Sequence, residues 1–220
     1  ALAEIEKLPG RHVYFLDDHL LGNERFANAL FDGMVGMGKV FQAASTVQAI
    51  LRPGLIEKAA RAGMRSCFVG FETLDAGNLS EHDKYQNLNR DYNAAIKRVH
   101  DNGIMVNGSF VFGMDNDDSS VFSRTVDWAV SQSIETATFH IMTPYPSTEL
   151  HNRMTREGRM VHRNWDLYDT RHVVYKPTRL TPQELEQGYW RAYKDFYSWS
   201  NLFKSANLKP DMRARMRHLS

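Results

Sequence analysis

The chain reads Cys67-Phe68-Val69-Gly70-Phe71-Glu72-Thr73 in its first third, a short apolar run that stops at an acid and a hydroxyl. The same design occurs four more times. These other runs and the polar or turn-forming clusters that end them are residues 13–16 before Asp17-Asp18, 40–44 before Ser45-Thr46, 110–112 before Gly113-Met114-Asp115-Asn116-Asp117, and 138–142 before Thr143-Pro144-Tyr145-Pro146. In a barrel of parallel strands the pocket lies at the carboxyl ends of the strands. We therefore expect these clusters to converge on one ligand.

Segments with helical periodicity separate the apolar runs. Their apolar residues recur three and four positions apart, and glycine or Asn-Gly follows several of them. The expected helices cover residues 23–35, 55–62, 91–100 and 119–130, with Pro53 in the first turn of the second. Strands and helices that alternate with short connections require right-handed crossovers and a parallel sheet. The expected fold class is therefore α/β.

Length and charge restrict the possible functions. A chain of 220 residues forms one sizeable domain plus an appendage, and folding removes roughly 70% of the surface of the unfolded chain. A net charge of +1 provides no field for a nucleic-acid groove, so nucleic acid is not an expected partner. The sequence has no apolar stretch of about 18 residues for a membrane span. Residues 1–7 have neither the basic start nor the apolar middle of a signal peptide, so the expected localisation is cytoplasmic.

Beyond Thr148 the pattern changes. Residues 150–157 predict a helix, and residues 160–161 and 172–175 predict two short strands. Thr181-Pro182-Gln183-Glu184 predicts the start of a long helix whose aromatic stripe packs against the barrel. Residues 209–220 are expected to be a solvated terminus. The predicted organisation is a barrel domain over residues 11–150 and a C-terminal extension over residues 151–220.

Generic catalytic and metal-binding motifs are weak. A single cysteine, Cys67, excludes internal disulfides and multi-cysteine metal sites, and its position in an apolar run favours an inert buried thiol. His140 stands alone among apolar neighbours, which favours a hydrogen-bonded wall residue over a metal ligand. Asp17-Asp18-His19 can bind a divalent ion or simply end a strand and cap the next helix. We therefore predict no metal site and assign no catalytic residue.

The ordered strand ends, taken together, resemble consecutive elements of radical S-adenosylmethionine (SAM) enzymes. The resemblance covers nearly the whole chain, and its closest branch is the cobalamin-dependent one, whose members carry an N-terminal corrinoid-binding domain. The segments that carry it are residues 14–18, 41–45, 62–73, Lys84, 100–104, 108–115, 143–148, 157–159 and 165–169. The fold that it implies is a partial (β/α)6 TIM-like barrel with parallel strands, in which the first βα unit is missing, plus a C-terminal helical extension.

The resemblance also implies which residues bind the cofactor. In this family the turn after the second strand holds the methionyl amino group of SAM. A carboxylate at the fourth-strand position contacts the ribose or the methionyl moiety. Apolar backbone of the fifth-strand motif lies beside the adenine, and the last strand closes the adenine side. The residues at these places, with those that end the third strand, are Leu16, Asp17, Asp18, Gln42, Ser45, Glu72, Thr73, Val111, Gly113, Thr143, Pro144 and Tyr145. Asp117 stands where many members have Glu.

One departure from the family pattern is large. Radical SAM enzymes hold a 4Fe-4S cluster through three cysteines in a Cys-x-x-x-Cys-x-x-Cys loop after the first strand, because thiolates are the ligands that hold such clusters. This chain has one cysteine, and it lies elsewhere. The resemblance therefore implies a fragment that lacks the corrinoid domain, the first strand and the cluster loop, and that is inactive alone. A natural variant that lost the chemistry is the other explanation.

The intact protein implied by the resemblance uses SAM, a 4Fe-4S cluster with ligands outside this chain, and cobalamin. It cleaves SAM to a 5'-deoxyadenosyl radical for methyl transfer or related C–H chemistry on a small-molecule substrate, with flavodoxin or ferredoxin as the electron donor. Residues 75–88 and 158–175 are expected to determine the substrate. The alternatives are a non-catalytic binding module and another TIM-barrel enzyme without a cluster. A strand edge left open at residues 13–16 is expected to promote self-association.

Overall fold

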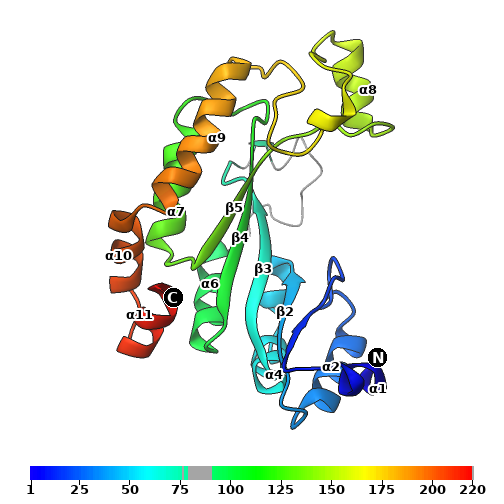
Figure 1. Ribbon diagram of the computed structural model, residues 1–220, viewed down its shortest axis with the longest axis vertical. Coiled ribbons are helices and arrows are strands. Elements are labelled where there is room, and N and C mark those ends of the chain that lie inside the picture. Colours follow the sequence, from blue (N-terminus) through cyan, green and yellow to red (C-terminus); the bar gives the residue numbers. More distant parts are fainter. Residues whose placement is uncertain (76, 79–90, 220) are drawn as a thin grey trace. The chain divides into compact units, whose positions relative to one another are not determined.

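The computed structural model describes residues 1–75, 77–78 and 91–219. Its sheet has the order β1-β2-β3-β4-β5, which is the order along the chain (Figure 1). β1 pairs with β2 in parallel, and β2 with β3. The strands are β1 (His12–Tyr14), β2 (Val40–Ser45), β3 (Met64–Glu72), β4 (Met105–Phe112) and β5 (Thr136–Ile141). The expected α/β class with parallel strands is confirmed.

The chain forms two compact units. The first unit consists of Ala1–Phe71, Gln86–Gly108 and Ile134–Thr136, and the second consists of Glu72–Tyr85, Ser109–Ser133 and Ala137–Ser220. β1 and β2 therefore lie in the first unit, with almost all of β3, while the second half of β4 and nearly all of β5 lie in the second. The division at residue 150 into a barrel and an extension stays a prediction.

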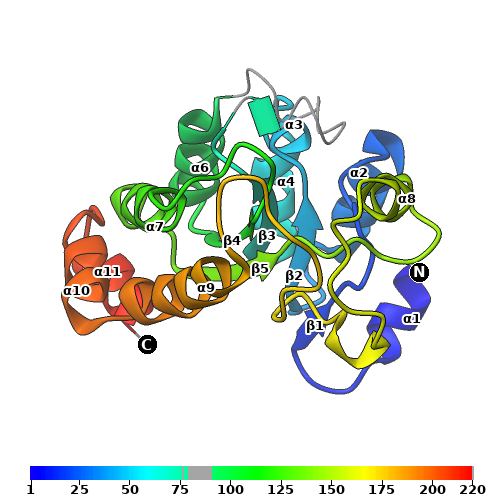
Figure 2. The same cartoon turned by 90° about the horizontal axis from the view of Figure 1, so that it is seen from above.

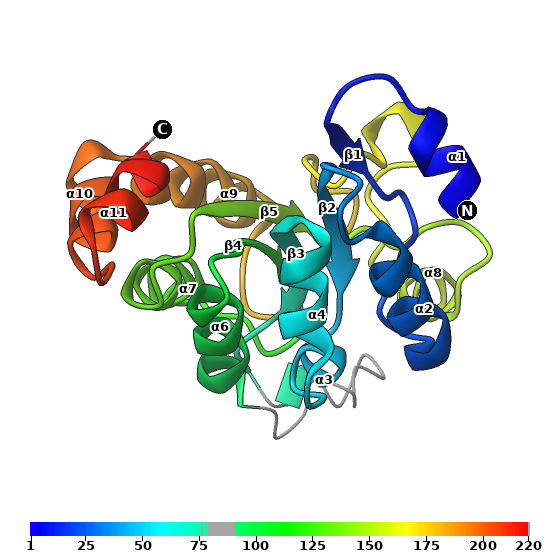
Figure 3. The same cartoon turned by 90° about the horizontal axis from the view of Figure 1, so that it is seen from below.

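Local signals in the sequence fix the helices of the first unit (Figure 3). They are α1 (Leu2–Lys7), α2 (Glu24–Met34), α3 (Val47–Ile50), α4 (Leu55–Ala62) and α6 (Tyr92–Asp101). The Asn23 side chain caps α2 by accepting from the Phe26 N–H. Gly63 ends α4 with φ of 112°, and a Cβ there would overlap the Lys39 carbonyl. Glycine is therefore required where α4 turns into β3.

The helices of the second unit, seen from above in Figure 2, include the long helix expected after Thr181. They are α7 (Val121–Ser131), α8 (Glu149–Arg156), α9 (Pro182–Phe196), α10 (Trp199–Asn207) and α11 (Met212–Leu219), with a short 3-10 helix η2 (Trp165–Leu167). Thr181 and Glu184 form the predicted capping box of α9. The Tyr193 hydroxyl donates to the Phe139 carbonyl and accepts from the Phe139 N–H, so the aromatic side of α9 packs on β5 as expected.

Three predictions about local structure are wrong. Pro53 lies outside α4, because Gly54 is the N-cap residue and has φ of 78°. Residues 160–161 and 172–175 form no named strands in the described chain; they meet at an isolated antiparallel bridge between Met160 and Tyr175, beside which the Val161 N–H donates to the Val174 carbonyl over 2.9 Å. The pairing stays this short because the chain turns into η2 at its N-cap residue Asn164, three residues after the first segment. The third error concerns the C-terminal residues.

The C-terminal residues fold as a helix instead of remaining a solvated terminus. α11 follows Lys209, whose side chain is buried and whose Nζ donates to the Ser133 carbonyl over 2.6 Å. Ser133 lies two residues after α7 ends at Ser131, and lysine side chains near a helix C-terminus commonly donate to backbone carbonyls there. His218, near the end of α11, is also buried.

In the ranges that the structure describes, no helix has both the length and the apolar character to cross a membrane. Most of the segment 75–88, which was expected to contact the substrate, lies outside the described residues, as does Lys84. The fold therefore presents the ends of β4 and β5 as the part of the second unit in which predicted site residues gather.

Candidate functional site

The turn after β4 is fixed around Gly113. Its φ is 94°, and a Cβ at this position would overlap the Tyr175 hydroxyl and approach Leu185 Cδ2 to 2.7 Å. The Tyr175 hydroxyl donates to the Gly113 carbonyl. The Met142 N–H donates to the Phe112 carbonyl over 2.9 Å, which ties this turn to the end of β5. Only glycine fits this backbone and this close approach, so the predicted adenine-side turn has a defined shape.

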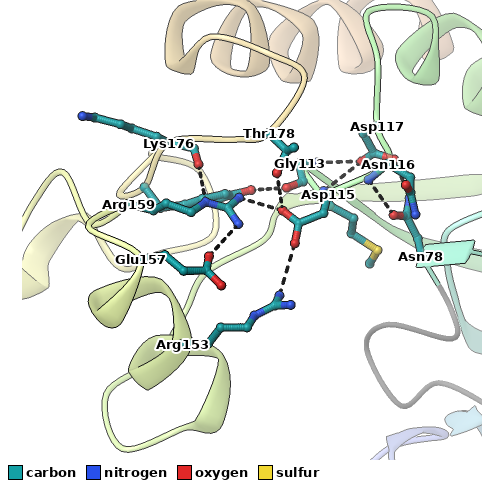
Figure 4. Close-up of polar contacts among 12 residues, drawn as sticks. Asn78, Gly113, Asp115, Asn116, Asp117, Arg153, Glu157, Arg159, Lys176 and Thr178 are labelled. Carbon is teal, nitrogen blue, oxygen red and sulfur yellow. Dashed lines mark hydrogen bonds and ion pairs between the residues drawn. The ribbon is translucent and has the colours of Figure 1, made fainter.

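Asp117 organises the same turn from inside (Figure 4). Its carboxylate is buried and accepts from the Gly113 N–H over 2.8 Å, the Met114 N–H over 3.0 Å and the Asn78 side-chain amide over 2.8 Å. Asn78 in turn accepts from the Asn116 N–H. Burial raises the pKa of Asp117 to about 6, while the same three donors favour the charged form. Asp117 is thus a positioning residue that shapes the turn.

Asp115 is the centre of a second group of polar contacts in the second unit (Figure 4). Its carboxylate accepts from Arg159 over 2.7 Å, from Arg153 over 3.3 Å and from the Thr178 hydroxyl over 2.7 Å. Arg159 also pairs with Glu157 at 3.2 Å. Burial raises the pKa of Asp115, but the hydrogen bonds and charge of Arg159 outweigh it and hold that pKa below its usual value. Asp115 therefore joins the β4 turn to residues 153–178.

Two further polar side chains, His140 and Thr138, lie on β5. The His140 Nδ1 lies 3.2 Å from the Thr170 hydroxyl, so the expectation of a hydrogen-bonded wall residue is confirmed. Burial lowers the pKa of His140, although the nearby Glu72 charge opposes this, and the neutral ring therefore predominates near neutral pH. Two residues earlier on the strand, the Thr138 hydroxyl is buried without a hydrogen-bond partner in the described part of the chain. These groups can bind a polar ligand atom through neutral hydrogen bonds.

Glu72, at the end of β3, has a backbone conformation that few side chains adopt. Its φ is 65°, in the left-handed region. Such conformations cost about 1–3 kcal/mol and concentrate at functional sites. Glu72 is half-buried, and the neighbouring Thr73 is buried, with its hydroxyl accepting from the Asp75 N–H over 3.1 Å. The strand therefore ends in a strained residue that carries a carboxylate.

The remaining predicted residues of the second unit differ in their exposure. Thr143 and Pro144 are buried, and the Thr143 hydroxyl donates to the Ile141 carbonyl over 3.0 Å. Tyr145 is exposed, and Val111 is half-buried. Tyr145 is thus available to a ligand, whereas the Thr143 hydroxyl is already bonded to the Ile141 carbonyl. Their cofactor-binding roles stay predictions.

The predicted residues of the first unit follow β1 or lie in β2, where Ser45 is the last residue but Gln42 lies mid-strand and not at the expected strand end. Leu16, Asp17 and Asp18 are exposed, with Leu16 84% exposed, and the Asp17 carboxylate accepts from the His19 N–H over 2.9 Å. Gln42 is half-buried and Ser45 is buried. Because strand residues alternate between faces, Gln42 and Ser45 point to opposite sides of β2. The exposed acids after β1 can accept hydrogen bonds from an ammonium group, and their convergence with the second unit's residues stays a prediction.

Sequence reasoning missed the contacts that tie these turns together. Asp115 and Arg159 were both quoted for the family resemblance, yet nothing in the sequence pairs residues 44 positions apart. The fixing of Gly113 by Tyr175 was missed for the same reason. The signal available in the sequence was an apolar strand followed by Gly113, Asp115 and Asp117. It identified the turn, but it did not identify Arg159 and Tyr175, which contact that turn. In the described ranges, no three His, Cys, Asp or Glu side chains gather as a metal site would require.

Comparison with known proteins identifies relatives of this chain. No family model matches. The chain is 29% identical over 196 residues to the bacteriochlorophyllide d C-12(1)-methyltransferase of Chlorobaculum tepidum, which covers 89% of this chain and 42% of that protein. It is 30% identical over 156 residues to the hopanoid C-2 methylase of Rhodopseudomonas palustris, covering 68% of this chain and 30% of that protein. The chain thus spans less than half the length of these curated relatives.

A solved structure has the same fold. The radical SAM methyltransferase TsrM from Kitasatospora setae, with cobalamin and a 4Fe-4S cluster bound, aligns with a TM-score of 0.61 at 15% identity, covering 71% of this chain and 32% of that one. The fold is therefore that of a partial radical SAM barrel. This fold and the sequence relatives, which are named as a methyltransferase and a methylase, support the predicted resemblance to the radical SAM enzyme family.

Proposed function

We propose that this chain is part of a radical SAM methyltransferase that transfers a methyl group to a small-molecule substrate with the help of cobalamin. The observation that carries the proposal is the 29% identity to a methyltransferase across 89% of the chain. A second relative is a methylase, and the structural neighbour TsrM contains cobalamin and a 4Fe-4S cluster. A flavodoxin or ferredoxin electron donor belongs to the same proposal.

The residues of this chain do not fit a 4Fe-4S cluster. Cys67 is the only cysteine, and it lies buried within β3. Burial raises the pKa of its thiol to about 12, so the thiolate that a cluster requires is not formed near neutral pH. The proposal therefore assigns the cluster ligands to a segment outside these 220 residues.

The residues fit SAM better. Leu16, Asp17 and Asp18 provide an exposed turn with carboxylates, which suits the ammonium of the methionyl group. SAM bound in a radical SAM enzyme supplies, on reductive cleavage, the group that abstracts a substrate hydrogen. We assign Gln42, Ser45, Glu72 and Thr73 to the methionyl and ribose side. The residues assigned to the adenine side are Val111, Gly113, Thr143, Pro144 and Tyr145.

The adenine-side assignment rests on how firmly the β4 turn is held. Gly113 is fixed by Tyr175 and by Asp117, so its backbone groups have one orientation. Such a pre-organised backbone favours the binding of a planar ring, because a flexible turn would lose entropy on binding. His140 and Thr138 offer neutral hydrogen-bonding groups beyond this turn, which we assign to the substrate.

The lone buried cysteine also favours a second candidate, a SAM-binding module without radical chemistry. The two candidates differ in what SAM becomes. A radical methyltransferase, with upstream sequence and reconstituted cluster, converts SAM to 5'-deoxyadenosine or S-adenosylhomocysteine under reducing conditions. A binding module leaves SAM unchanged.

The test compares two proteins by calorimetry and by product analysis. One is the 220-residue chain, and the other is the natural polypeptide including its upstream sequence, with its cluster reconstituted without oxygen. We expect the longer protein to bind and consume SAM, and D17N/D18N in it to weaken SAM binding. Lys7→Gln, an exposed change in the first unit, is the matched control. A reconstituted longer protein that binds SAM without consuming it supports the module, and one that does not bind SAM refutes both candidates.

A further inference from the structure

The last two helices expose a set of large apolar side chains. Trp199 and Phe203 are one turn apart on α10, and their rings stack with centroids 5.9 Å apart. Met212, Met216 and Leu219 have the spacing of a single stripe along α11. Trp199 is 72% exposed and Met212 is 67% exposed. We call the exposed side chains of these two helices and the residue between them the C-terminal apolar surface: Trp199, Phe203, Leu208, Met212, Met216 and Leu219.

These helices are held in place by their other side. Ser205 and Ala206 of α10 are buried, and the Ser133 hydroxyl donates to the Ser205 carbonyl over 3.1 Å. Lys209 donates to the Ser133 carbonyl over 2.6 Å. α10 contacts α7, α9 and α11, and Figures 1 and 3 show α10 and α11 side by side. The exposed apolar side chains therefore belong to a folded, anchored pair of helices.

The same segment is basic. Residues 199–219 contain Lys204, Lys209, Arg213, Arg215 and Arg217 against a single acid, Asp211, although the net charge of the whole chain is only +1. Lys204 and Arg213 are exposed. These two exposed positive charges therefore lie on the same two helices as the apolar surface. A surface that combines aromatic and aliphatic side chains with Lys and Arg is complementary to an anionic lipid headgroup layer.

We propose that the C-terminal apolar surface docks onto the face of an anionic lipid bilayer. Trp199 and Phe203 would enter the interfacial layer, where aromatic side chains concentrate, and Lys204 and Arg213 would lie among anionic headgroups. A second copy of this chain is a poorer occupant, because two basic surfaces repel each other when they meet. The inference goes beyond the proposed methyl transfer and stands or falls independently of it.

The experiment measures cosedimentation of the 220-residue chain with vesicles of phosphatidylcholine alone and with vesicles that also contain phosphatidylglycerol. We expect binding only to the anionic vesicles, weakened by added salt. Each basic side chain near an anionic surface strengthens binding by a factor of about five, so K204Q/R213Q should weaken it roughly thirtyfold. W199S/F203S should weaken it by roughly tenfold or more.

Matched controls separate docking from general stickiness. Lys7→Gln with Arg61→Gln removes two exposed charges from the first unit, and Trp165→Ser removes an exposed tryptophan outside the surface. Both controls should bind like the unchanged chain. Equal binding to neutral vesicles, or equal losses in the controls, would overturn the proposal. So would concentration-dependent dimerisation abolished by W199S/F203S, or lack of vesicle binding by the natural longer polypeptide.

Discussion

Asp117→Asn tests whether the β4 turn depends on a single buried carboxylate. In the folded chain one carboxylate oxygen accepts from the Gly113 and Met114 N–H groups, and the other accepts from the Asn78 amide. An asparagine can still accept from the two backbone groups, but its own NH₂ then faces the Asn78 NH₂. One buried donor is left without a partner, which costs about 1–3 kcal/mol.

Urea unfolding followed by circular dichroism measures this loss. With a denaturant dependence of about 2 kcal/mol per molar urea, the midpoint should fall by about 0.5–1.5 M. Asp118→Asn is the matched control, because Asp118 is adjacent in sequence and exposed, and it should change the midpoint far less. Equal midpoints for D117N and the unchanged chain would refute the account of this turn.

The same variant tests the sign of a pH dependence. Burial raises the pKa of Asp117 to about 6, above its value of about 4 in the unfolded chain. Because the folded chain binds this proton more tightly than the unfolded chain, protonation of Asp117 stabilises the fold. This stabilisation is fully present below about pH 4 and is lost as the pH rises through about 6. The free energy of unfolding of the unchanged chain minus that of D117N should therefore increase by about 2–3 kcal/mol when the pH is lowered from about 7 to 4. A difference that shrinks instead would contradict this.

Three further substitutions test other contacts by the same unfolding measurement. Gly113→Ala should destabilise by about 2–4 kcal/mol, because it combines a positive φ with overlap on Tyr175, whereas Gly36→Ala, with φ of 88° and open space around it, should cost only about 1 kcal/mol. Arg159→Ala should lower the free energy of unfolding by about 2–3 kcal/mol, because it removes the principal partner of the largely buried Asp115 carboxylate. A loss below about 0.5 kcal/mol would contradict this, since it is what exposed ion pairs contribute. Tyr193→Phe should cost about 1 kcal/mol through the loss of two bonds to the β5 backbone, and no change would show that ring packing alone anchors α9.

Local patterns were sufficient to predict most of the elements. The apolar runs became strands because each run is short and ends at residues that favour turns. Gly63 and the Thr181–Glu184 capping box marked helix boundaries because their signals act within one helical turn. The sequence also located the turn at Gly113, since glycine after an apolar strand is a local signal.

Contacts between distant residues could not be predicted. The Asp115–Arg159 pair joins residues 44 positions apart, and either side chain alone is typical of a solvated surface. Lys209 was expected in a solvated terminus, because a lysine among polar residues gives no indication that a carbonyl 76 positions earlier will accept from it. These contacts depend on how the chain folds back on itself, and periodicity within one element carries no such information.

Photoaffinity labelling tests the central claim, that the ends of β4 and β5 contribute the adenine side of a SAM site. The probe is SAM with an azide on the adenine, applied to the natural longer polypeptide with its cluster reconstituted, and labelled peptides are mapped by mass spectrometry. The account predicts label at Val111–Gly113 or Thr143–Tyr145, removed by competition with unmodified SAM. Label confined to other segments, or label that SAM does not compete away, would contradict it.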